Sequence, residues 1–196
     1  MLQPKRIIAA DDDQIMRDCY RKMLPTLGHE VVFIAGNGDE LIMACETTKP
    51  DLVITDIRMP GPDGIDAANR IWVEWGIPSV LVSAYHDYEL LERAGSDAIF
   101  GYLVKPIEEI DLEAAICVAT KRFELFVQVR SEASELRQAL ADRKIIERAK
   151  GIVMSRTGLS EAEAFRKLQK LSWDRNQKLV EIARFVIEGD ELVSTK

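Results

Sequence analysis

Five short apolar runs alternate with longer segments of helical periodicity through the first half of the chain, and this alternation limits the fold more than any other feature. The runs lie at residues 5–10, 31–34, 52–56, 77–83 and 98–103. The segments between them predict helices at 14–27, up to 48, 64–75 and 87–95. Strands that alternate with helices predict a parallel sheet covered on both faces. We therefore expect an α/β, flavodoxin-like (βα)5 fold with strand order 2-1-3-4-5.

Polar residues follow the apolar runs where four of the strands should end. They are Asp11-Asp12-Asp13, Asp56, Ser83 and Lys105. The carboxyl ends of parallel strands are where open α/β sheets bind ligands. Clustered carboxylates repel one another unless a cation lies among them, and oxygen ligands suit Mg²⁺. Asp56 could then receive a phosphoryl group as a nucleophile, with Lys105 and Ser83 contacting its oxygens.

Residues 5–125 resemble the receiver domain of two-component response regulators, and we assign residues 1–125 to this domain. The residues that carry the resemblance are Asp11-Asp12, Asp56, Met59 through Gly64, Ser83-Ala84, and Tyr102 through Lys105-Pro106. The resemblance implies Mg²⁺ bound by Asp11, Asp12, Asp56 and the backbone carbonyl of Arg58. It also implies phosphorylation of Asp56 by a cognate histidine kinase, a switch pair of Ser83 and Tyr102, and a cis bond between Lys105 and Pro106. Asp13 is left as the N-cap of the following helix.

A long helix is expected after the receiver domain, because residues 110–155 contain no proline and Gly151 is their only glycine. Two apolar seams have coiled-coil spacing: Leu112, Ile116, Ala119, Phe123 and Phe126, then Val129, Ala133, Leu136 and Leu140. Residues 126–140 are therefore interpreted as a helical linker. Either seam could pair with a second copy of the chain or pack within its own chain.

The last third is locally basic, with 11 Lys and Arg against 5 Asp and Glu in residues 137–178, although the whole chain has a net charge of −7. Its pattern predicts three helices in a small bundle, with Ser160 and Glu163 as a capping box. Residues 132–189 resemble the ANTAR domain, an RNA-binding module of antitermination regulators, through Ala139-Leu140, Arg143, Ile146, Ala149-Lys150-Gly151, Met154, Gly158, Ala164-Phe165, Leu168 and Ala183.

The candidate RNA contacts lie around the glycine of this motif: Arg143, Lys144, Arg148, Lys150, Gly151 and Arg156. Gly151 inside a helix is unfavourable by ~1 kcal/mol relative to Ala, so it needs a reason. One reason is close approach of a partner, and the other is packing against the next helix. Trp173 could stack on a base, but a packed position in the bundle is favoured.

The sequence predicts a cytoplasmic regulatory protein rather than an enzyme. No association with a membrane is expected. Phosphorylation at Asp56 would favour a homodimer that presents two bundles to paired RNA stem-loops and so promotes transcription antitermination. The alternatives are a DNA-binding regulator with a helix-turn-helix bundle and a switch that acts through protein contacts alone. Neither the inducing signal nor the RNA target follows from the sequence.

Overall fold

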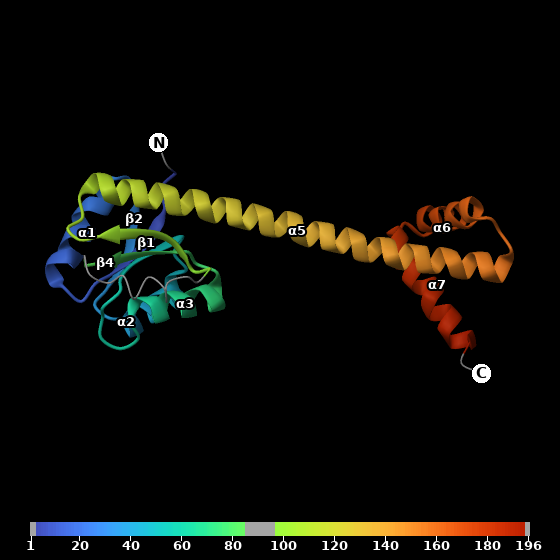
Figure 1. The fold of residues 1–196 in the computed structure, drawn as a ribbon, viewed down its shortest axis with the longest axis horizontal. Coiled ribbons are helices and arrows are strands. Elements are labelled where there is room, and N and C mark those ends of the chain that lie inside the picture. The colour runs from blue at the N-terminus through green and yellow to red at the C-terminus, as the bar shows by residue number, and fades with distance from the viewer. Residues whose placement is uncertain (1–2, 85–96, 195–196) are drawn as a thin grey trace. The chain divides into compact units, whose positions relative to one another are not determined.

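The structure, a computed structural model, describes residues 3–84 and 97–194 (Figure 1). The helix expected at residues 87–95 lies outside the described residues. The chain divides into two compact units, residues 1–127 and 128–196, and each unit is described separately.

The first unit is built on a five-stranded parallel sheet in the order β2-β1-β3-β4-β5, which confirms the predicted topology. The strands are β1 (Arg6–Ala10), β2 (Glu30–Ala35), β3 (Leu52–Asp56), β4 (Ser79–Ser83) and β5 (Ile99–Val104). Every residue of β3 and β4 is buried. Both strands lie inside the sheet, with a neighbouring strand on each side.

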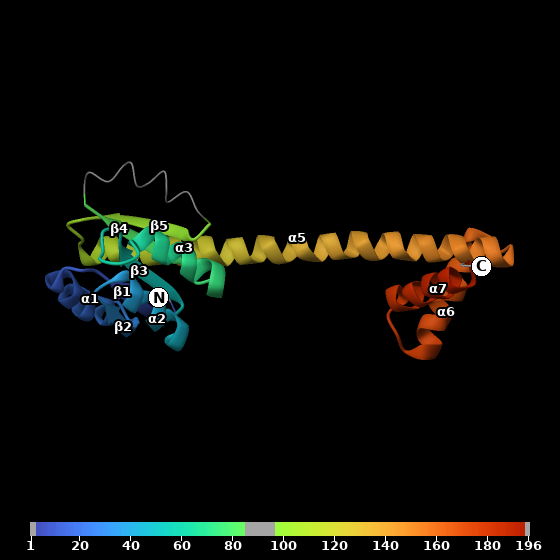
Figure 2. The ribbon, with the colours of Figure 1, turned by 90° about the horizontal axis from the view of Figure 1, so that it is seen from below.

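Helices cover both faces of the sheet, as Figures 1 and 2 show. They are α1 (Gln14–Thr26), α2 (Gly38–Thr48), α3 (Gly64–Trp75) and the first part of α5 (Glu109–Thr157). Alternate residues of β1 point to opposite faces. Ile7 and Ala9 belong to the core under α1 and α5, and Ile8 and Ala10 to the core under α2 and α3.

The two seams of α5 have different environments. The first packs within its own chain: Leu112, Ile116 and Ala119 are buried against the sheet, and Phe123 and Phe126 pack at the margin of the same core. The second stays on the surface in the described chain, with Val129, Leu136 and Leu140 exposed by 62%, 64% and 53%. The first seam thus explains how the start of α5 packs against the sheet, whereas the second lacks a partner within the described residues.

The second unit is a small bundle of the end of α5, α6 (Glu161–Arg175) and α7 (Leu179–Ser194), as the sequence predicts. Its core consists of Ala149, Leu168, Ile182, Ala183 and Ile187. The predicted capping box is present at the start of α6, where the Glu163 carboxylate accepts from the Ser160 N–H at 3.0 Å.

The favoured packing of Trp173 is wrong, because its side chain is 80% exposed. Trp173 lies in the last turn of α6, just before the left-handed Asn176 that ends the helix. None of the helices in the described parts of the chain combines the length and the apolar character needed to span a bilayer.

Candidate functional site

Four polar side chains meet at one edge of the sheet because their strands are parallel. Asp11 directly follows β1, Asp56 and Ser83 are the last residues of β3 and β4, and Lys105 directly follows β5. The register pairs Asp56 with Val82 and Ser83 with Val104, so that neighbouring strands end at the same level. The structure therefore brings together the residues that the sequence predicts at the strand ends.

A single ammonium group bridges two of the carboxylates. Lys105 Nζ lies 2.8 Å from Asp11 Oδ2 and 3.1 Å from Asp56 Oδ1. Asp11 is fully buried and Asp56 is 6% exposed, so both charges are largely shielded from water. The Lys105 backbone N–H donates to the Ser83 carbonyl at 2.9 Å, which holds the lysine beside β4. The bond between Lys105 and Pro106 is cis, as the resemblance implies.

The donor set of this edge fits a divalent cation. One carboxylate oxygen from each of Asp11, Asp12 and Asp56 can be chosen so that all three lie within 4.8 Å of one another. Three carboxylates facing one ammonium leave an excess of negative charge, which a divalent ion would neutralise. Oxygen donors are the ligands that Mg²⁺ prefers. Arg58 follows in the loop after β3, and ligation by its carbonyl stays a prediction.

Burial and neighbouring charges set the protonation of the central pair. Burial raises the pKa of Asp56; Lys105 opposes this shift, and the charges of Asp11 and Asp12 add to it. Burial alone would lower the pKa of Lys105, but the hydrogen bond from Lys105 to Asp11 and the charges of Asp56 and Asp11 outweigh burial and raise it. Lys105 therefore stays charged at neutral pH and can contact an anionic oxygen placed beside Asp56.

Two glycines lie directly against the backbone of the loop between β3 and α3. The Gly64 N–H donates to the Ile57 carbonyl at 2.8 Å, and the Gly38 N–H donates to the Pro60 carbonyl at 3.2 Å. A Cβ atom on Gly64 would lie 1.9 Å from the Asp56 carbonyl oxygen, and one on Gly38 would lie 2.0 Å from the Pro62 carbonyl oxygen. The sequence reasoning missed both roles, although a glycine at the first position of each helix is a usable signal.

The predicted switch pair lies beside this loop. The buried Ser83 hydroxyl donates to the Ala84 carbonyl at 3.0 Å. Tyr102 is half-buried and packs against Ile57, Ile65 and Leu81. Both residues therefore adjoin the structure around Asp56, and their switching stays a prediction.

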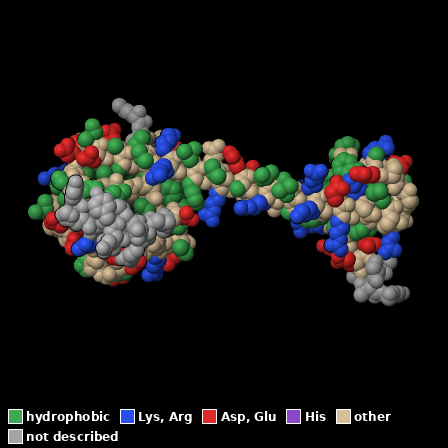
Figure 3. Space-filling model, in the orientation of Figure 1, with side chains coloured by type: hydrophobic (Ala, Val, Ile, Leu, Met, Phe, Trp, Pro, Cys, Tyr) green, Lys and Arg blue, Asp and Glu red, His purple; other side chains and the backbone are tan. Residues whose placement is uncertain are grey.

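Ion pairs within the bundle engage three of the predicted RNA contacts. Arg148 lies 2.8 Å from Glu191 and Arg156 lies 2.8 Å from Asp190. Lys150 is 8% exposed and contacts Glu147 and Glu161 at 2.6 and 2.7 Å. Figure 3 shows acidic and basic side chains interspersed on this unit. The acidic partners give Lys150 an evident structural role, because it joins α5 to α6.

Exposed groups make up the rest of the predicted set. Arg143 and Lys144 are exposed on α5. Gly151 is also exposed, and a Cβ atom added to it would meet nothing within 4 Å. Packing against the neighbouring helix, one of the two reasons offered for this glycine, is therefore absent within the described residues. Close approach of an external partner remains.

Comparisons with known proteins match both halves of the chain. A response regulator receiver domain matches residues 7–117, and an ANTAR domain matches residues 134–187. The transcriptional regulatory protein PdtaR of Mycobacterium tuberculosis is 38% identical over 94% of this chain and 90% of its own length. Both matched families are regulatory domains rather than enzymes.

Solved receiver domains match the first unit. A response regulator receiver domain protein from Clostridium thermocellum is 28% identical with a TM-score of 0.56, over 62% of this chain and 98% of that one. The receiver domain of a modulated diguanylate cyclase from Desulfovibrio desulfuricans is 27% identical with a TM-score of 0.59, over 63% and 98%.

Proposed function

Because the chain belongs to the response regulators that join a receiver domain to a C-terminal ANTAR domain, we propose that phosphorylation of Asp56 controls binding of its ANTAR domain to RNA stem-loops. The observation that carries this proposal is the ammonium of Lys105, which lies within 3.1 Å of both Asp56 and Asp11 at the ends of the parallel strands. The cognate partner is a histidine kinase. Binding of the protein to the RNA prevents a terminator hairpin from forming, so that transcription continues.

Several residues of the receiver domain would have separate roles when the protein accepts a phosphoryl group. An Asp56 carboxylate oxygen forms the new bond to phosphorus while the P–N bond to the phosphohistidine of the kinase breaks and its imidazole leaves. The Lys105 ammonium contacts one phosphoryl oxygen and the Ser83 hydroxyl turns to another. Asp11, Asp12 and Asp56 would hold Mg²⁺, which supplies positive charge for the phosphoryl oxygens when it is bound. The added group carries about −1.5 to −2 charges, so it competes with Asp11 for Lys105.

Phosphorylation is proposed to favour a homodimer through the second seam of α5. Val129, Leu136 and Leu140 expose half or more of their surfaces, so a second copy that covered them would gain hydrophobic stabilisation. Residues eleven apart, such as Val129 and Leu140, lie almost on one line of a helix, because three turns span about eleven residues. Val129, Leu136 and Leu140 thus form one apolar stripe suited to pairing.

The RNA surface is proposed to combine cations with exposed aromatic rings. Arg143 and Lys144 are exposed on α5, and Trp173 is exposed at the end of α6. Unpaired loop bases stack on such rings, while phosphates contact cations. Because Gly151 has no side chain, an RNA strand could approach the backbone of α5 closely at this position.

The decisive experiment couples the two halves of the proposal. The full chain is treated with acetyl phosphate and Mg²⁺, and its mass and its binding to hairpin RNA are measured beside Asp56→Ala. Asp97→Asn is the control, because Asp97 is an exposed carboxylate that precedes β5, at the edge of the sheet opposite to the strand ends that carry Asp56 and Lys105. We expect phosphorylation to raise dimer content and RNA affinity in wild type and control only. Equal RNA affinity in Asp56→Ala and phosphorylated wild type would refute control by Asp56.

Two competitors separate the proposal from its alternatives. Duplex DNA of equal length that binds more tightly than the hairpin would favour a helix-turn-helix output. An absence of salt-dependent nucleic-acid binding in both phosphorylation states would favour a switch that acts through protein contacts alone.

A further inference from the structure

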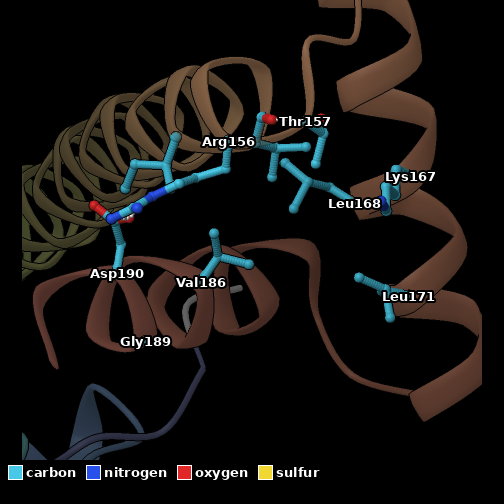
Figure 4. Close-up of a pocket in the computed structure, with 10 residues that line it drawn as sticks. Arg156, Thr157, Lys167, Leu168, Leu171, Val186, Gly189 and Asp190 are labelled. Carbon is cyan, nitrogen blue, oxygen red and sulfur yellow. Dashed lines mark hydrogen bonds and ion pairs between the residues drawn. The ribbon is translucent and has the colours of Figure 1, made fainter. Parts of the chain in front are cut away.

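An apolar pocket of ≈ 410 Å³ opens among the three helices of the second unit (Figure 4). Five aliphatic side chains line it: Ile152, Val153, Leu168, Leu171 and Val186. Its volume is within the range of roughly 300–1,000 Å³ that is typical of small-ligand sites. The pocket is large enough for a single flat ring and too small for a folded element.

Charged groups stand at the border of this pocket. Arg156 Nε and Nη2 both lie 2.8 Å from Asp190 Oδ1, so two contacts converge on one carboxylate oxygen. The second oxygen of Asp190 can accept from another donor. Lys167 adds a further cation from α6, and Figure 4 shows it on the opposite side of the pocket from the ion pair. The border therefore offers two cations and one acceptor around an apolar interior.

Gly189 keeps one wall of the pocket open. It lies inside α7, where a glycine is unfavourable because its backbone loses more freedom than that of other residues. Gly189 and Asp190 are three and four residues after Val186, so all three lie on one face of the helix. A Cβ atom on Gly189 would meet nothing within 4 Å. Packing within the described chain therefore does not account for this glycine, which leaves space for an occupant of the pocket.

We propose that this pocket takes one unpaired nucleobase from the RNA that the ANTAR domain binds, an inference that rests on the proposed function. The aliphatic walls contact the faces of the ring, and the second oxygen of Asp190 accepts from an amino or imino group on its edge. Lys167 and Arg156 contact the phosphates on either side. RNA loops present bases of this kind, unstacked and splayed out. Asp190 offsets the charge of Arg156, so the border keeps an excess of one positive charge with Lys167, which favours an anionic chain over an apolar protein side chain.

The test uses the full chain and a pool of RNA hairpins that share one stem and carry a randomised loop. Hairpins that wild type retains are then made with an abasic nucleotide at each loop position in turn. Gly189→Leu fills the pocket, and Gly189→Ala fills it partly. Ala162→Leu is the matched control, because Ala162 is an exposed residue on α6 and the substitution adds bulk without a change of charge.

We expect Gly189→Leu to bind the selected hairpin at least tenfold more weakly, Gly189→Ala to be intermediate, and Ala162→Leu to match wild type. One abasic position should weaken binding to wild type by a similar factor and have little further effect in Gly189→Leu. Such coupling identifies the base that occupies the pocket, because only interacting groups are non-additive. Circular dichroism and urea unfolding confirm that each variant is folded.

Three results would overturn the inference. If folded Gly189→Leu and wild type bind the selected hairpin with equal affinity, no base occupies the pocket, although the proposed RNA binding would still stand. A change of oligomeric mass in Gly189→Leu, without coupling to any loop position, would assign the pocket to a second copy of the chain. Retention of no hairpin in either phosphorylation state would refute the proposed function itself, and the base pocket with it.

Discussion

Gly64→Ala should disrupt the loop that follows Asp56, the proposed phosphoacceptor. The new Cβ atom would lie 1.9 Å from the Asp56 carbonyl oxygen, whereas ordinary contacts begin at 3.4 Å, so the backbones must separate by about 1.5 Å. Overpacking typically costs ~1–3 kcal/mol, and weakening the 2.8 Å bond from Gly64 to Ile57 adds to this. We expect the free energy of unfolding to fall by about 3 kcal/mol.

The assay is urea unfolding followed by fluorescence in a Trp173→Phe background, where Trp72 and Trp75 of the first unit supply the signal. For a slope near 2 kcal/mol/M, the midpoint should fall by about 1.5 M. Gly36→Ala is the matched control, since its Cβ atom would meet its nearest neighbours at 3.6 Å, an ordinary contact. It should stay within ~0.5 kcal/mol of wild type. Equal midpoints for the two variants would refute the steric argument.

Three further predictions concern charge, assembly and binding. In EDTA at pH 7, Asp56→Asn should unfold at higher urea than wild type, because burial raises the pKa of Asp56 and its ionised form opposes folding. This difference should vanish toward pH 3, where the carboxyl group is neutral in both states; a difference that persists there would contradict it. Leu136→Glu should weaken the phosphorylated dimer at least tenfold in sedimentation experiments, whereas the exposed control Gln138→Glu should not. Trp173→Ala should leave stability within ~0.5 kcal/mol and lower hairpin affinity about tenfold; unchanged affinity would exclude stacking on Trp173.

Much of the first unit follows from local patterns. Each strand is a short apolar run, and the side chains that matter stand directly after such runs, as Asp56 and Lys105 do. Parallel strands then bring these residues together without further information. The sheet order and the meeting of Asp11, Asp56 and Lys105 were therefore predictable from the sequence.

Contacts between helices were not predictable in this way. The ion pair of Lys150 with Glu161 spans a turn between α5 and α6, and it depends on how the two helices pack. The exposure of Trp173 likewise depends on where α6 ends relative to its neighbours. The steric role of Gly64 depends on the path of a backbone segment rather than on any residue type. The pattern of charge and hydrophobicity along the sequence does not determine these contacts between distant residues.

The loop after β3 also determines the direction in which a disturbance at Asp56 can spread. At Gly38 and Gly64 the loop packs so closely against other backbone atoms that one added methyl group would clash. Side chains yield more readily than backbone, and the pliable neighbours are the Ser83 hydroxyl and the half-buried ring of Tyr102. If a phosphoryl group forms on Asp56, we therefore expect the backbone of this loop to hold its position and the side chains on β4 and β5 to move.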